Sequence, residues 1–230
     1  MIDSLLRQIT LLDSLALGWF LICWAGYVYF SEYGPVARRG LIGISHGYRV
    51  EWARQMLARE VRIVDSALVG NLMTSISFYA NTTIYIVAGL MAVLGTLDTA
   101  ISVAEGLPFT RAAGRELWEL KLLLLLAIFV FAYFKFTWAL RQFNLLSILI
   151  GAAPLPSVAE AERDRFADKL AAVNTLGGDE FNRGIRAYYF GLAALSWFVQ
   201  PGLFIAVTTV IVAVLYRRDF ASRTLSVLRD

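Results

Sequence analysis

Two lysines lie in or beside a long apolar stretch, where a charged side chain could do membrane chemistry. Lys121 and Lys135 are about four helical turns apart, or about 21 Å, and the rotation between them is only about 40°. They therefore lie on one side of a helix. Intramembrane lysines serve ion or proton paths or, near a helix end, extend to the interface, and we favour the latter. If they are buried, the candidate partners are Asp13 for Lys121, and Glu32, Asp65 or Glu180 for Lys135.

Another apolar stretch has a polar first half. At heptad spacing, small and polar residues form one stripe, which comprises Gly70, Thr74, Ser77, Asn81, Ala88 and Gly95. Small residues let membrane helices approach closely, and an Asn amide can hydrogen-bond across the contact. The same residues are compatible with the lining of a solute or ion path. We favour the helix contact, because such residues are common where membrane helices pack.

A similar stripe occurs near the C-terminus. Gly184, Ala187, Gly191 and Ala194 recur at helical spacing and predict a second packing face. This face could meet the stripe of Asn81.

Known catalytic and metal-binding patterns are absent from the sequence. His46 is the only histidine and Cys23 the only cysteine, which excludes multi-histidine and thiolate metal centres within one chain. No nucleotide-binding loop, nucleophile elbow or zinc-protease motif occurs. We therefore expect no catalytic residue, no cofactor and no metal.

Basic residues follow the first apolar stretch. Arg38, Arg39 and Arg49 could form a collar that binds lipid headgroups, or they could act only as a topology signal. The small net charge of +3 and the position of the arginines beside apolar stretches suit a membrane surface, and we expect no nucleic-acid partner.

Long uncharged stretches set the architecture. Residues 14–31, 66–97 and 187–216 carry no charge, and residues 122–140 carry only Lys135. A bilayer core takes about 20 apolar residues as a helix. Mean hydropathy is +0.62 and 58% of residues are hydrophobic, more than in soluble domains. We predict an all-α membrane domain over residues 1–230, a four-helix bundle with spans at about 12–31, 70–97, 118–140 and 187–216.

Two further helices are expected outside the bilayer. Apolar residues at helical spacing predict an amphipathic helix over about 48–69, which runs without Gly or Pro into the second span. A capping-box pattern at Ser157 and Glu160 starts another amphipathic helix over about 157–176. It is expected to end at Gly177 and Gly178.

Positive charge predicts the orientation. Six arginines lie between the first two spans, and six lysines or arginines lie between the third and fourth. The positive-inside rule places these loops in the cytoplasm and both termini on the outer, periplasmic side of a bacterial inner membrane. The C-terminal tail argues against this, because it carries Arg217, Arg218, Arg223 and Arg229.

Three segments resemble a known family. Residues 77–83 (SFYANTT), 134–144 (FKFTWALRQFN) and 182–190 (NRGIRAYYF) are similar to those of the membrane family called domain of unknown function 599. The resemblance implies several membrane spans and no chemistry. It draws attention to Asn81, Lys135, Arg141, Asn144, Asn182 and Arg186.

These features favour a non-enzymatic structural or accessory component of a membrane assembly. Its partners would be the bilayer and either further copies of itself or a larger membrane complex. The alternative is an oligomeric channel or transporter that uses the polar half of the second span, with Asn81 and Thr74 beside a water-accessible path.

Overall fold

The computed structural model describes residues 9–34, 37–106 and 114–229, and every regular element in these ranges is helical. The predicted all-α class is therefore confirmed for this part of the chain. The elements are α2 Leu11–Glu32, η1 Ala37–Arg39, α3 Leu41–Leu57, α4 Ile63–Gly95, α5 Leu97–Glu105, α6 Arg115–Gly151, α7 Glu160–Leu195, η2 Ser196–Phe198, α8 Pro201–Phe220 and α9 Arg223–Val227.

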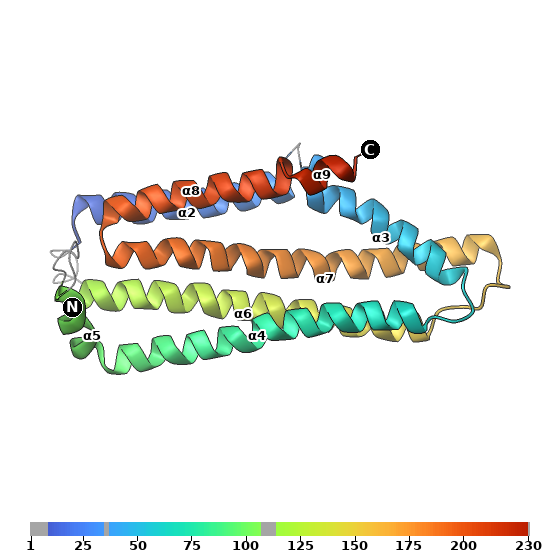
Figure 1. Cartoon of the computed structure of the whole chain (residues 1–230), viewed down its shortest axis with the longest axis horizontal. Coiled ribbons are helices and arrows are strands. Elements are labelled where there is room, and N and C mark those ends of the chain that lie inside the picture. The colour runs from blue at the N-terminus through green and yellow to red at the C-terminus, as the bar shows by residue number, and fades with distance from the viewer. Residues whose placement is uncertain (1–8, 35–36, 107–113, 230) are drawn as a thin grey trace.

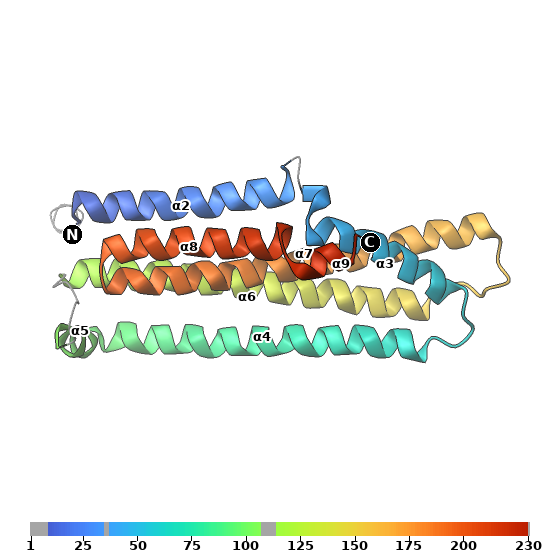
Figure 2. The ribbon, with the colours of Figure 1, turned by 45° about the horizontal axis from the view of Figure 1, so that its top comes forward.

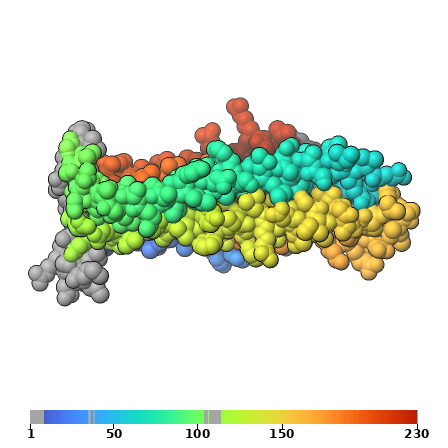
Figure 3. All heavy atoms as spheres, turned by 90° about the horizontal axis from the view of Figure 1, so that it is seen from below, coloured from blue at the N-terminus to red at the C-terminus, as the bar shows by residue number. Residues whose placement is uncertain are grey.

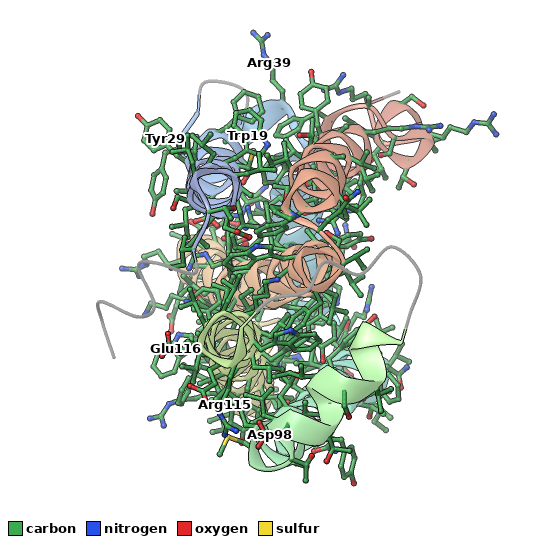
Figure 4. All side chains as sticks on the ribbon, turned by 90° about the vertical axis from the view of Figure 1, so that its left-hand side faces the viewer. Trp19, Tyr29, Arg39, Asp98, Arg115 and Glu116 are labelled. Atoms are coloured by element: carbon green, nitrogen blue, oxygen red, sulfur yellow. The ribbon has the colours of Figure 1, made fainter. Side chains whose placement is uncertain are left out.

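The helices form an elongated stack with α6 and α7 at its centre (Figures 1 and 2). α6 packs against both α7 and α4, while α7 also contacts α3 and α8. α4 lies beside α6 along one face of the molecule (Figure 3). The pair of α2 and α8 lies at the opposite edge from α4, as the end-on view shows (Figure 4).

Among the described residues, three helices are long and apolar enough to cross a membrane, namely Leu11–Glu32, Ile63–Gly95 and Arg115–Gly151. They contain all or most of the first three predicted spans. α2 begins with a capping box, in which the Thr10 hydroxyl accepts from the backbone N–H of Asp13. α6 continues to Gly151, well beyond the predicted end at residue 140.

The prediction of one span over residues 187–216 is wrong. α7 ends at Leu195, and α8 begins at Pro201 after a short turn. Proline lacks the N–H that a helix interior needs, and it favours extended backbone in the preceding residue. Gln200 is extended accordingly, with φ −164° and ψ 151°.

After this turn α8 runs back along the molecule, parallel to α2 (Figure 2). The Trp19 indole donates to Thr209 at 3.1 Å, and the Tyr27 hydroxyl donates to Asp219 at 2.7 Å. From the first of these bonds to the second, the residue number rises in both helices, so α2 and α8 run in the same direction. The start of α2 and the end of α8 therefore lie at opposite ends of the pair, which removes the basis for placing both termini on one side.

The predicted helix over 48–69 does not run into the second span. α3 ends at Leu57 and α4 starts at Ile63. Asp65, which has no exposed surface, accepts from the Trp52 indole at 3.0 Å and from the Arg59 guanidinium at 2.9 Å. These bonds to the start of α4 hold the end of α3 and the turn after it, so α3 packs on α7 instead.

The predicted helix over 157–176 is only the first half of α7. The predicted capping box is absent, because the N-cap is Ala159 and makes no side-chain cap bond. Gly177 and Gly178 do not end the helix. A Cβ on Gly177 would lie 2.8 Å from Cε2 of Phe143, and one on Gly178 would overlap the Arg49 guanidinium. These glycines permit close packing.

Large residues of α6 fit against small residues of α7 in the core. Phe136 lies against Gly184, and Phe129 lies against Gly191. Ala187 is also fully buried. The second packing stripe of the sequence is therefore a contact in the fold, but its partner is α6 rather than the stripe of Asn81. α2 joins this core through Trp24, whose ring stacks on Phe190 with centroids 5.2 Å apart.

Candidate functional site

Charged side chains from α2, α6 and α7 meet where α2 ends. We call this group the Glu32 cluster; it comprises Ser31, Glu32, Lys135, Glu180, Arg183 and Arg186. Arg186 is only 2% exposed, and Ser31 and Glu180 are each 7% exposed. The cluster therefore lies inside the helix stack.

The charges of the Glu32 cluster alternate in sign. Glu32 accepts from the Nη2 atoms of Arg183 and Arg186, each at 2.6 Å. Arg183 also pairs with Glu180, whose Oε2 lies 2.9 Å from Nζ of Lys135. Buried ions are costly to desolvate unless each is paired and hydrogen-bonded. Pairing across three helices makes this burial possible.

A cavity of about 270 Å³ opens beside the Glu32 cluster. Its lining includes ionisable side chains of both kinds, the acids Glu32 and Asp179 and the bases Arg183 and Arg186. His46 of α3 also lines it, with Nδ1 at 2.9 Å from the Thr175 hydroxyl. Oxygen Oδ1 of Asp179 and Nε of Arg186 are buried without a hydrogen-bond partner among the described residues.

Asp179 and Arg49 perturb one another beside this cavity. Burial raises the pKa of the Asp179 carboxyl, and the nearby Arg49 guanidinium opposes that rise. Burial likewise lowers the pKa of Arg49, while Asp179 raises it. Burial of Asp179 thus favours the neutral carboxyl, and the neighbouring guanidinium groups favour the carboxylate.

A second buried polar group ties the other end of α2 to the centre. The Trp197 indole donates to Asp13 at 2.9 Å, and Lys121 donates to the Trp197 carbonyl at 2.9 Å. Lys121 is 4% exposed, so it does not extend to the interface as predicted. Asp13, its predicted partner, is joined to it through Trp197. Lys135 pairs with Glu180, one of the three partners predicted for it.

The polar stripe of α4 faces outward. Gly70, Thr74, Asn81 and Ala88 are exposed, and Ser77 is half-buried. The Thr74 hydroxyl donates to its own helix at the Gly70 carbonyl. The predicted packing role of Gly70 and Ala88 is therefore wrong within one chain. For the same reason the stripe does not line a path through the single-chain stack.

Arg39 and Arg49, two of the three arginines predicted to bind headgroups, do not lie together. Arg39 projects from the body of the molecule (Figure 4), whereas Arg49 lies between α3 and α7 against Gly178. The side chain of Arg38 lies outside the described part. The residues that line the charged cavity instead come from α2, α3 and α7.

Sequence reasoning missed Arg183 and Asp179 as site residues. One signal was present, because Glu180, Arg183 and Arg186 recur every third residue directly before an uncharged stretch, which places them on one side of a helix. In the described ranges, no group of three His, Cys, Asp or Glu residues could hold a metal ion.

A family model described as "Protein of unknown function, DUF599" matches residues 15–224. No curated protein and no solved structure matches the chain.

Proposed function

The chain belongs to the DUF599 family, whose description assigns no activity, and we propose from its geometry a non-enzymatic structural role in a membrane. In this proposal the protein assembles with further copies of itself through the exposed face of α4. The observation that carries the proposal is the exposed Asn81 amide in the middle of a long apolar helix.

Five helices cross the bilayer in this proposal, one more than the four expected from hydropathy. α2, α4 and α6 have the required length and composition. The uncharged part of α8, residues 201–216, is about 24 Å long. α7 is uncharged only over residues 187–195, but α6 and α8 pack on it and shield it from lipid.

Five crossings agree with the distribution of charge. The N-terminus is then outside and the C-terminus in the cytoplasm of a bacterial inner membrane. The basic loops before α4 and α7 share the cytoplasmic side with Arg217, Arg218, Arg223 and Arg229. The positive-inside rule then holds without the conflict that four spans create at the C-terminal tail.

The surface of α4 supports self-association. Only 17% of the most apolar segment of α4 is buried, against 22% for α2 and 44% for α6. The Asn81 side chain is exposed on this surface. An amide in hydrocarbon is costly without a partner, and Asn side chains hydrogen-bond between membrane helices. A second copy supplies such a partner together with small residues that permit close approach.

A channel between copies is the alternative. The first half of α4 also exposes Asn71 and Ser75, so several α4 helices around one axis would line a polar path. Flux of ions or small solutes through liposomes that contain the purified protein would favour this alternative, and sealed liposomes would favour the structural role.

Disulfide cross-linking tests self-association. Asn81→Cys in a Cys23→Ser background should form oxidised dimers in native membranes. Val210→Cys on α8 is the matched control, because this residue is 58% exposed on a different helix. Equal cross-linking at both positions would contradict an interface on α4. Asn81→Leu should weaken assembly roughly threefold, as expected for a bond of about 0.6 kcal/mol.

A further inference from the structure

An apolar groove lies near the charged cavity and shares Tyr33 with its lining. The groove has a volume of about 530 Å³ and runs between α2 and α6. Leu21, Trp24 and Val28 line it from α2, and Leu124 and Phe131 line it from α6. It therefore lies along the apolar part of two helices that are suited to cross the membrane.

Tyr33 lines both the groove and the charged cavity. Tyr29, which also lines the groove, lies on the side of α2 that faces away from α8 (Figure 4). The two hollows thus adjoin at Tyr33, one apolar along α2 and the other ionic at its end. A ligand that fits both parts has an apolar tail and a charged head.

The polar atoms of the cavity that have no hydrogen-bond partner indicate which ligand headgroup the cavity can hold. The Nη atoms of Arg186 are occupied by Ser31 and Glu32, and those of Arg183 by Glu32 and Glu180. Arg186 Nε remains as a buried donor, and Asp179 Oδ1 as a buried acceptor. A complementary head must therefore both accept and donate hydrogen bonds.

The charges of the lining residues further restrict the class of headgroup that the cavity can bind. Glu32 and Asp179 balance Arg183 and Arg186 in the cavity lining, so a zwitterion fits better than a net anion. A phosphate oxygen can accept from Arg186, and an ammonium N–H can donate to Asp179. A quaternary ammonium has no N–H to donate, and of the Trp, Tyr and Phe rings that usually form its aromatic cage the lining contains Tyr33 only.

We infer that this site binds one zwitterionic aminophospholipid, with its phosphate and primary ammonium in the cavity and an acyl chain in the groove between α2 and α6. This inference goes beyond the proposed structural role and does not depend on self-association. Arg186 and Asp179 are the residues that select the headgroup, and Val28 and Phe131 contact the chain.

Lipid titration of the purified full-length protein in detergent tests the site. The ligands are phosphatidylethanolamine, phosphatidylcholine and phosphatidylglycerol with identical acyl chains, together with glycerophosphoethanolamine, which has no chains. Binding is measured by native mass spectrometry and by the shift in Tm. Phosphatidylethanolamine should bind about tenfold tighter than phosphatidylcholine, the preference expected from one charge-assisted hydrogen bond.

Point variants distinguish recognition of the headgroup from binding of the acyl chain. Asp179→Asn should remove the preference for phosphatidylethanolamine, whereas Asp168→Asn, on an exposed position of the same helix, should retain it. Val28→Trp should weaken all three lipids alike by filling the groove. Three results would overturn the inference: equal binding of the three lipids, an unchanged preference in Asp179→Asn, or binding of glycerophosphoethanolamine as tight as that of the lipid.

Discussion

Arg186 shows how a permanent charge can be buried in this fold. Its guanidinium cannot lose its proton in a protein, yet the residue is only 2% exposed. Glu32 and Ser31 accept from its two Nη atoms. A buried guanidinium is tolerated because its partners replace most of the lost hydration. Arg186 Nε and Asp179 Oδ1 are buried without a hydrogen-bond partner among the described residues, and both residues line the cavity.

Asp179 makes stability depend on pH. Its pKa is raised mainly by burial, so the folded chain holds this proton more tightly than the unfolded chain. The resulting stability is present below the unfolded pKa and is lost as pH rises through the raised folded pKa. The Asp179→Asn variant has no carboxyl at this position, so its stability does not fall in this way as the pH rises. In lipid-free detergent its Tm should exceed that of wild type at pH 7.

The pH profile of Tm checks this prediction. The difference between Asp179→Asn and wild type should shrink as pH falls through the raised pKa, and it should vanish below the ordinary range of an aspartate. Asp168→Asn, at an exposed position, should follow wild type throughout. A lower Tm for Asp179→Asn at pH 7 would mean that the carboxylate stabilises the fold through Arg49.

At the scale of elements, the contact between α6 and α7 holds the stack together. Gly184→Leu would drive a side chain into Phe136, and Gly191→Leu into Phe129, whose Cζ lies 3.0 Å from a Cβ at that position. Overpacking of this kind typically costs about 1–3 kcal/mol. Both variants should unfold at lower temperature in detergent.

Gly26→Leu is the matched control, because a Cβ on this α2 glycine has open space around it. Its Tm should stay close to that of wild type. If Gly184→Leu and Gly191→Leu melt no lower than Gly26→Leu, α6 and α7 do not pack along these glycines.

Hydropathy predicted α2 and the apolar parts of α4 and α6, because each has an uncharged or nearly uncharged run of about bilayer length. It failed at Pro201, where a turn lies inside one uncharged run and leaves no gap in the pattern. It also failed at Asp65, because bonds from Trp52 and Arg59 separate α3 from α4 where the sequence has no helix breaker.

The site could be predicted only in part for a related reason. Sequence offered Glu180 as a partner of Lys135, since charges near the same membrane boundary are few. It could not place Asp179 beside Arg49, because Gly177 and Gly178 resemble the end of a helix. Their actual role, close contact with Phe143 and Arg49, depends on helices distant in sequence.

At the scale of the whole molecule, the turn between α7 and α8 decides the topology. With α7 and α8 antiparallel (Figure 1), the C-terminal arginines return to the end of α2 that carries Glu32. In the proposed topology the outer end then has the start of α2, α5 and the uncharged turn of residues 196–200. In the proposed topology this arrangement places most of the lysines and arginines on the cytoplasmic side and leaves Arg7, Arg111 and Arg115 on the outer side, as the positive-inside rule requires.

Thiol labelling of intact cells tests this topology most directly. Single cysteines are placed at Gly106, Gln200 and Ser226, each exposed in the fold, in a Cys23→Ser background. Five crossings predict that a membrane-impermeant reagent labels Gly106→Cys and Gln200→Cys, and labels Ser226→Cys only after the membrane is opened. Labelling of Ser226→Cys in intact cells to the same extent as Gly106→Cys would contradict the account.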